Sequence, residues 1–204
     1  MKMEDIEIIR KVMKAEISSI KKQEQQLNSN KEEFNLIIKE ILALKGHLII
    51  MGVGKSGHIG KKLAATFAST GTPSFFIHAT EAMHGDLGMI TKDDLVIIIS
   101  NSGETSEALA PIDAIHRIGA RIIALTGQEH STLARKSEFL LEVQVDREAD
   151  TFNLAPTNSS TSVLVVGDSL ALAISVLKNF TEEQFGMYHP GGALGRKLVE
   201  EGKL

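Results

Sequence analysis

Short, uninterrupted apolar runs separated by helix-length segments constrain the fold of this chain most strongly. The runs occupy residues 48–51, 75–77, 95–99, 122–125 and 139–141, and most are followed by Gly, Ser or Thr. Because they are continuous rather than alternating, they are typical of parallel strands that helices cover on both faces. The sequence therefore predicts an α/β fold with a doubly wound, mainly parallel five-stranded sheet flanked by helices.

Two amphipathic helices are expected before the first strand. The first has one apolar face, formed by Ile6, Ile9, Met13, Ile17 and Ile20. Ser29 and Glu32 have the spacing of a capping box at the start of the second helix, and Gly46 suits its end. The apolar faces need cover from the sheet or from another subunit. We expect a single domain over residues 1–204, with helices in 1–45 and the core in 46–200.

The loops after the strands are where a ligand is expected, because open α/β sheets bind ligands outside the carboxyl ends of their strands. Residues 146–162 form the longest polar connection, and residues 163–177 read as a last long apolar helix. A second domain is not expected.

Composition excludes several functions. The net charge of −4, from 22 Lys+Arg and 26 Asp+Glu, provides no general basic surface for nucleic acid. The absence of Cys excludes disulfides, a thiolate nucleophile and a Cys-based zinc site. The first five residues are charged rather than apolar, and no apolar run approaches the roughly 20 residues of a membrane span. We therefore expect a cytoplasmic protein without a nucleic-acid or membrane partner.

A glycine loop follows the first apolar run. Residues 52–58 match GxGxxG, but the P-loop fails because Ile49 stands where a Gly is required. A dinucleotide site is also weakened, since the second strand ends at His78 rather than at an acidic residue. A tight turn with an exposed Lys would be the structural alternative. We expect Gly54 and Ser56 to approach a ligand, with Lys55 projecting beside them.

A turn rich in hydroxyl groups follows the third run. Ser100, Asn101, Ser102 and Thr105 surround Gly103 immediately before a short helical pattern. Free N–H groups at a helix start and several hydroxyl donors favour a phosphate, whereas an ordinary N-cap needs only one such residue. This turn is the predicted phosphate site. A second cluster at residues 154–162, including Thr157, could be another hydroxyl-lined wall or a simple loop and cap.

Four side chains in the expected loops suit a proton-transfer reaction: Lys55, Glu107, Glu148 and His189. Sugar isomerisation needs a base for a carbon-bound proton, help with ring opening and a group that stabilises an enediolate. Any one of these residues alone would more commonly be a solvated or structural group. We favour Glu148 as the base, with Glu107 and His189 as alternatives. His78 and His84 give only a weak metal signal, because no third ligand accompanies them.

Several long motifs together resemble a known family. They are GVGKSGH (52–58), FASTGTPSFFIHATEAMHGDLGM (67–89), SNSGETSE (100–107), LAPTNSSTS (154–162) and HPGGALGRKL (189–198). In this order, over about residues 48–198, they resemble the D-arabinose 5-phosphate isomerases of the sugar isomerase (SIS) domain family. The resemblance implies interconversion of D-arabinose 5-phosphate and D-ribulose 5-phosphate through a cis-enediol, which is the entry to Kdo synthesis for lipopolysaccharide.

The resemblance also implies a homotetramer with active sites between subunits and no required cofactor. It assigns catalysis to the same four side chains named above. It associates Gly71, Thr72, His78 and His84 with substrate, and His78 also with an inhibitory zinc.

Family members commonly continue into CBS domains, and none is expected here. Feedback by a metabolite such as CMP-Kdo would then act at the sugar site itself. A non-catalytic sugar-phosphate sensor and an isomerase of another phosphosugar remain the alternative functions.

Overall fold

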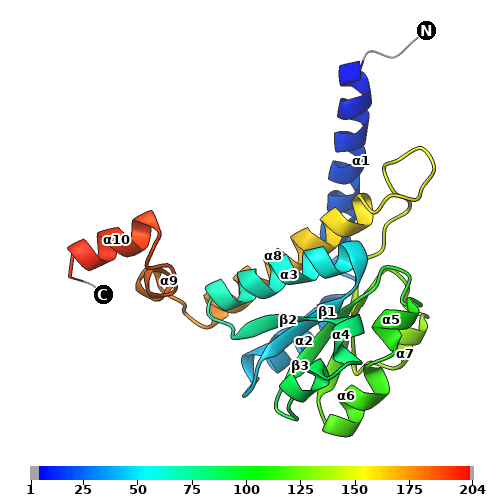
Figure 1. Ribbon diagram of the computed structural model, residues 1–204. Coiled ribbons are helices and arrows are strands. Elements are labelled where there is room, and N and C mark those ends of the chain that lie inside the picture. Colours follow the sequence, from blue (N-terminus) through cyan, green and yellow to red (C-terminus); the bar gives the residue numbers. More distant parts are fainter. Residues whose placement is uncertain (1–4, 203–204) are drawn as a thin grey trace.

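The computed structural model describes residues 5–202 and is built around one parallel sheet (Figure 1). Residues 1–4, part of the charged opening discussed above, and 203–204 lie outside the described residues. The strands are β1 (Leu48–Gly52), β2 (Ser74–His78), β3 (Leu95–Ile99), β4 (Arg121–Thr126) and β5 (Phe139–Glu142). Their order is β2-β1-β3-β4-β5, and every neighbouring pair is parallel. The predicted α/β architecture is confirmed.

The continuous apolar runs are explained by burial on both faces of the sheet. In β1, Ile50 contacts one core and its neighbours Ile49 and Met51 contact the other, and all are fully buried. Successive side chains of a strand point to opposite faces, so a strand covered on both sides carries no polar positions.

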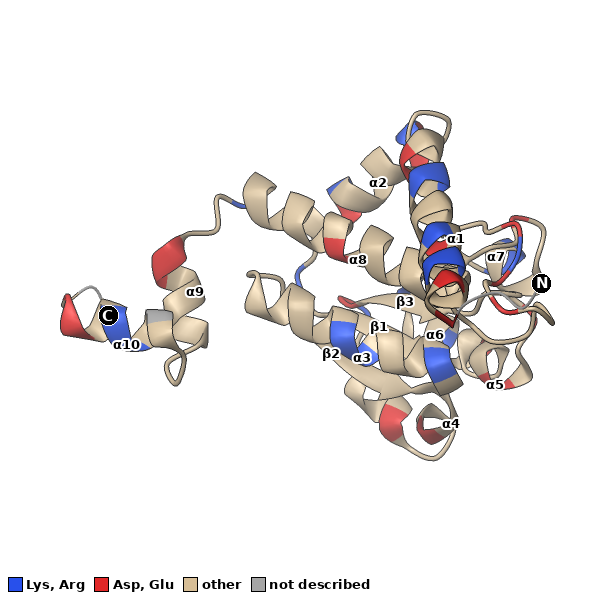
Figure 2. Cartoon of the chain, turned by 90° about the horizontal axis from the view of Figure 1, so that it is seen from above, with Lys and Arg blue, Asp and Glu red and all other residues tan. Residues whose placement is uncertain are grey.

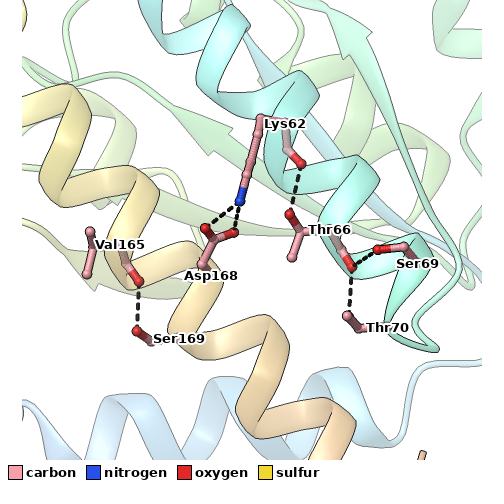
Figure 3. A network of polar contacts seen from close by, with 7 residues as sticks. All are labelled: Lys62, Thr66, Ser69, Thr70, Val165, Asp168 and Ser169. Atoms are coloured by element: carbon pink, nitrogen blue, oxygen red, sulfur yellow. Dashed lines mark hydrogen bonds and ion pairs between the residues drawn. The ribbon is translucent and has the colours of Figure 1, made fainter. Parts of the chain in front are cut away.

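Helices α2 (Lys31–Leu42), α3 (Gly54–Ser69) and α8 (Asn158–Leu177) cover one face. Phe67 of α3 and Ile174 of α8 belong to the core beneath them. Lys62 of α3 forms an ion pair with Asp168 of α8 on the outer side of this layer (Figure 3). By length and composition alone α8 could cross a membrane, with a mean hydropathy of 1.8. Its packing on α3 and on the sheet core is that of a core helix.

Shorter elements cover the opposite face (Figure 2). They are α4 (Ala79–Ala82), the 3₁₀ helix η1 (Asp86–Met89), α5 (Ser106–Leu109), α6 (Ile112–Ile118) and α7 (Thr132–Arg135). Ala108, Ile112 and Ile115 bury their side chains against this side of the sheet. Basic and acidic residues are interspersed along the chain in Figure 2, as the small net charge suggests.

The N-terminal helical pair is present, but two details of its prediction are wrong. Helix α1 (Asp5–Gln26) is followed by α2, whose N-cap is Asn30; Ser29 instead donates to the carbonyl of Gln26. Helix α2 ends at Leu42, before Gly46. A Cβ at Gly46 would lie 2.2 Å from Asp94 Oδ1, so this glycine makes room for a buried carboxylate rather than ending a helix.

Two short helices follow α8, which is the last long apolar helix of the described chain, as predicted. They are α9 (Glu182–Tyr188) and α10 (Ala193–Glu200). Figure 1 shows them packed together beyond the end of α8, away from the sheet. We call residues 179–202 the C-terminal arm.

The strand order also locates the functional end of the molecule. From β1 the chain moves to one side to form β2, and then crosses to the other side for β3. The carboxyl ends of β1 and β3 therefore flank the topological switch point, where open α/β sheets hold their ligands.

Candidate functional site

A cavity of about 290 Å³ lies at this switch point. Residues that follow β1, β3 and β5 and residues at the start of α8 form its walls. The lining residues are Lys55, Ser56, Ile59, Ile99, Asn101, Val145, Asp146, Arg147, Glu148, Asn153, Leu154, Pro156, Ser159, Ser160 and Val163. Four residues selected from the sequence are therefore together in one cavity: Lys55, Ser56, Asn101 and Glu148.

The glycine loop leads directly from β1 into α3. Val53 is the N-cap, Gly54 begins α3, and Lys55 and Ser56 lie in the first turn, where they reach the cavity. The first backbone N–H groups of a helix lack intrahelical partners, so this wall offers hydrogen-bond donors beside a cation. Such a wall suits an anionic group or a developing oxyanion.

The turn at residues 100–105 is preorganised by its own hydroxyl groups. Ser100 and Thr105 hydrogen-bond through their side chains at 3.0 Å, and the N–H of Gly103 donates to Ser100 Oγ at 3.2 Å. Ser102 Oγ accepts a hydrogen bond from the N–H of Glu104. The helix that follows, α5, has only one turn. An anion at this turn, as the sequence predicts, would therefore depend on hydroxyl groups and main-chain N–H groups more than on a helix dipole.

Glu148 is a buried carboxylate, 9% exposed, that caps α8. Its Oε2 accepts hydrogen bonds from the N–H of Thr157 at 2.8 Å, the hydroxyl of Thr157 at 3.1 Å and the N–H of Ser159 at 3.2 Å. The hydroxyl of Ser159 donates to Oε1. Among the described residues Oε1 accepts only this one hydrogen bond, so its second lone pair can still accept a proton from a sugar.

The loop that carries Glu148 is braced from two sides. Its Asp150 carboxylate accepts hydrogen bonds from three backbone N–H groups, of Phe152, Leu154 and Ala155. Desolvation raises the pKa of Asp150, but these N–H groups lower it by more, so the net shift is downward.

Helix α1 braces the same loop and lies beside it in Figure 1. Lys22 pairs with Asp146, and Gln23 donates to the carbonyl of Gln144 at 2.7 Å.

Glu107 is exposed on α5 and is not among the residues that line the cavity. Its own backbone N–H and the hydroxyl of Ser106 lower the pKa of its carboxyl group. Glu107 is therefore ionised at neutral pH, but within one chain the structure does not bring it to Glu148.

His189 lies in the tight turn between α9 and α10. Its Nδ1 is 2.8 Å from the carbonyl oxygen of Phe185, and its ring stacks on that of Phe185 with centroids 4.0 Å apart. Because a carbonyl can only accept, Nδ1 carries the hydrogen and Nε2 of the neutral ring is left to accept a proton.

His189 cannot reach the cavity of its own chain. Glu148 caps the start of α8, whereas His189 lies beyond its end. A helix of 20 residues spans about 30 Å, and the C-terminal arm continues away from the sheet (Figure 1). Any site that combines these two side chains must draw on two chains.

The remaining predicted substrate residues lie outside the cavity. Gly71 and Thr72 precede β2, so they lie at the amino ends of the strands, whereas the cavity lies at the carboxyl ends. His84 is exposed after α4, and the hydroxyl of Thr157 bonds within the loop to Ala149, Ala155 and Glu148. Their contact with substrate stays a prediction.

His78 ends β2 with a buried Nδ1 that has no hydrogen-bond partner among the described residues. Within residues 5–202 no group of three His, Asp or Glu side chains is arranged to hold a metal ion. The predicted zinc at His78 therefore lacks companion ligands within the described part of one chain.

Sequence reasoning missed five polar residues that line the cavity: Asp146, Arg147, Asn153, Ser159 and Ser160. Both serines belong to the hydroxyl cluster at residues 154–162, from which only Thr157 was selected. Arg147 precedes Glu148 and bonds to the loop carbonyls of Glu148 and Asp150. The hydroxyl cluster indicated this part of the site in the sequence. Which of its members face the cavity depends on where α8 begins, at Asn158, and the sequence did not give that residue.

Comparisons with known proteins identify the family of the chain. The chain matches the SIS domain over residues 41–173. It is 50% identical over 190 residues to Arabinose 5-phosphate isomerase KdsD of Escherichia coli K12, covering 93% of this chain and 57% of that protein. Identity to the Pseudomonas aeruginosa protein of the same name is 52% over 168 residues, covering 82% and 52%. The chain therefore spans little more than half the length of these curated relatives.

Among solved structures, that of E. coli CFT073 c3406 in complex with arabinose 5-phosphate is 51% identical to this chain. It superimposes with a TM-score of 0.88, covering 93% of this chain and all of that one. The SIS match includes every strand of the sheet and every residue that lines the cavity. This chain therefore belongs to the SIS domain family.

Proposed function

We propose that this chain is an aldose–ketose isomerase that interconverts D-arabinose 5-phosphate and D-ribulose 5-phosphate. The observation that carries the proposal is that one cavity at the switch point holds Lys55, Asn101 and Glu148 together. The names of the relatives at about 50% identity supply the sugar. On this proposal the protein acts in the cytoplasm at the entry to Kdo synthesis, as a homotetramer.

The phosphate of the substrate binds at the turn of residues 100–105. Ser102 and Thr105 there supply hydroxyl donors, and the first N–H groups of α5 lie next to them. Lys55 lines the same cavity as Asn101 of this turn and stabilises negative charge on the phosphate or on the enediolate.

Ring opening uses His189 of a neighbouring subunit. With its hydrogen on Nδ1, its Nε2 accepts the proton of the anomeric hydroxyl as the C1–O bond to the ring oxygen breaks. The ring oxygen takes up a proton in the same step, so the open-chain aldehyde forms without net gain or loss.

Proton transfer then converts the aldose to the ketose. Glu148 removes the proton from C2 while the C1 carbonyl oxygen gains a proton, which gives the cis-enediol. The C2 hydroxyl next loses its proton as the carboxylic acid returns one to C1, and the atoms balance. Glu107 is the alternative base, and it would have to come from another subunit or move.

The first test is an NMR assay with D-arabinose 5-phosphate in deuterated water. D-ribulose 5-phosphate should appear, with deuterium exchanged at C2 of the recovered aldose, because a solvent-exchangeable base moves the proton. A pure protein that leaves the sugar unchanged would favour a sensor, and conversion of another phosphosugar alone would change the substrate.

Inhibition by CMP-Kdo should be competitive with the sugar.

The second test replaces the base. Glu148→Gln should lower kcat by about 10³-fold with little change in KM, since a general base contributes on this scale. Thr157→Val is the matched control, because it removes one hydrogen bond to Glu148 and keeps the carboxylate. It should cost about 1 kcal/mol of stability and leave kcat within about tenfold. Near-normal turnover of Glu148→Gln would transfer the role to Glu107.

A further inference from the structure

The junction between α8 and the C-terminal arm determines where His189 is held. Figure 1 shows α9 and α10 beyond the end of α8, so the arm depends on its base for its direction. The residues that act at this base are Lys178, Asn179 and Phe180 on one side and Gly71 and Thr72 on the other.

The exit angle of the arm is set by the end of α8. Asn179 has φ +54°, and the N–H groups of Phe180 and Asn179 bond back to the carbonyls of Ser175 and Val176. This is the Schellman arrangement, in which a left-handed residue ends a helix and turns the chain. The arm therefore leaves α8 in a defined direction rather than through a free linker.

Phe180, the next residue, packs against Gly71. Gly71 has φ +93°, and a Cβ built on it would lie 2.5 Å from Cδ2 of the Phe180 ring. Both the backbone angle and the approach of the ring require glycine at this position. The turn between α3 and β2 thus holds the side chain of Phe180, the second residue of the arm.

Lys178 joins the same two segments. Its Nζ donates to Thr72 Oγ1 at 2.9 Å and to the carbonyl oxygen of Gly71 at 3.3 Å. Burial lowers the pKa of Lys178, and Thr72 is only 1% exposed. A half-buried ammonium needs such acceptors, and the carboxyl ends of α3 and α8 both favour a cation here.

Contacts within the arm connect its base to His189. Phe180 stacks on Tyr188, the residue before His189, with centroids 5.8 Å apart. Thr181 and Gln184 form a capping box at the start of α9, and His189 is bonded to Phe185 of the same helix. A displacement at residue 178 would therefore displace the imidazole.

We propose that Lys178, seated on Gly71 and Thr72, is a positioning residue that aims the His189 imidazole of one chain at the cavity of another. The inference rests on the isomerase function proposed above. It also gives Gly71 and Thr72 a role other than the substrate contact expected from the family resemblance. A misplacement of about 1 Å in a catalytic group can lower a rate by up to about 10²-fold.

The experiment is a double-mutant cycle between Lys178 and His189. Lys178→Met should lower kcat by about tenfold or more with KM within about twofold, and Lys178→Arg should recover part of the loss. In a His189→Ala background, Lys178→Met should lower kcat no further, because its effect acts through the imidazole. A role confined to general folding would lower kcat in both backgrounds.

Lys62→Met is the matched control. It also removes a lysine that ties α3 to α8, through Asp168, but it leaves the base of the arm intact (Figure 3). It should lower the unfolding midpoint without changing kcat. A loss of kcat equal to that of Lys178→Met would overturn the proposal.

A structural measurement makes the inference independent of turnover. The chain has no Cys, so Glu81→Cys and Glu182→Cys can carry two spin labels, one on the body and one on the arm. Lys178→Met should broaden the distance distribution between them in spin-diluted samples. An unchanged distribution, additive kinetics or an effect on KM alone would overturn the inference. Full activity of His189→Ala would also overturn the inference, because no imidazole would then need aiming. An inactive parent enzyme would instead refute the proposed function.

Discussion

Asp94 is a buried carboxylate directly before β3, at the amino ends of the strands and so on the side of the sheet opposite the cavity. It is 3% exposed, and its oxygens accept hydrogen bonds from the N–H of His47 at 2.6 Å and from the N–H and hydroxyl of Thr91 at 2.6 and 2.9 Å. Burial, the largest influence, raises the pKa of Asp94, but these donors together with His47 lower it below 3.8 overall. The residue joins the turn before β1 to the turn before β3.

Asp94→Ala should lower the free energy of unfolding at pH 7 by roughly 2 kcal/mol, because buried donors lose their acceptor. The folded-state pKa lies below the unfolded value of 3.8, so the stabilisation is complete above 3.8 and is lost as the pH falls through the folded-state pKa. The difference in the free energy of unfolding between wild type and Asp94→Ala should therefore become smaller in acid. Urea unfolding at pH 7, 5 and 3 measures this difference. A difference that does not change with pH would contradict stabilisation by the ionised carboxylate.

At the scale of elements, the contact between α3 and α8 unites the cavity with the arm. Both helices begin at the cavity, with Lys55 and Ser159, and both end at the base of the arm. Gly167 lets the helices approach, since a Cβ there would lie 2.5 Å from Leu63 Cδ1. Leu63 is 1% exposed, so it has little room to move.

Gly167→Val should lower the free energy of unfolding by about 2 kcal/mol, because overpacking outweighs the gain in helix propensity. Leu63→Ala added to it should restore part of the loss by making space, although Leu63→Ala alone is destabilising. Gly88→Ala is the control, because no atom lies within 4 Å of a Cβ at that position. Denaturant unfolding measures the free energy of unfolding of Gly167→Val, Leu63→Ala, the double variant and Gly88→Ala. If the losses of Gly167→Val and Leu63→Ala simply add in the double variant, the two side chains are not in contact.

At the scale of the whole molecule, the described chain leaves large apolar surfaces uncovered. Ile9 and Met13 of α1 are 55% and 59% exposed, and Val176 near the end of α8 is 75% exposed. Large apolar side chains exposed in this way on helices are typical of interfaces. Together with the arm, they support the proposal that active sites form between subunits.

Mixed oligomers test that proposal. Subunits with Glu148→Gln retain His189, and subunits with His189→Ala retain Glu148, so co-assembly should create complete sites from two inactive chains. Purification through two different tags should yield activity about tenfold or more above either variant alone. Mixed oligomers as inactive as their parents would place both residues in a site made by one chain.

The local pattern of the sequence determined the fold class and part of the site. Continuous apolar runs reveal burial on both faces because a strand repeats every two residues. Parallel strands bring their carboxyl ends to one edge, so Lys55, Ser56, Asn101 and Glu148 could be expected to meet there, and they line one cavity.

Only the tertiary structure decided how those residues are held. Glu148 caps a helix through Ser159, 11 positions along the chain, and Gly46 accommodates Asp94 rather than ending a helix. Such contacts depend on loop conformation and on side chains far apart in sequence, which leave no periodic signal. The separation of His189 from Glu148 likewise follows from the length and direction of α8, a property of the folded molecule that no local pattern records.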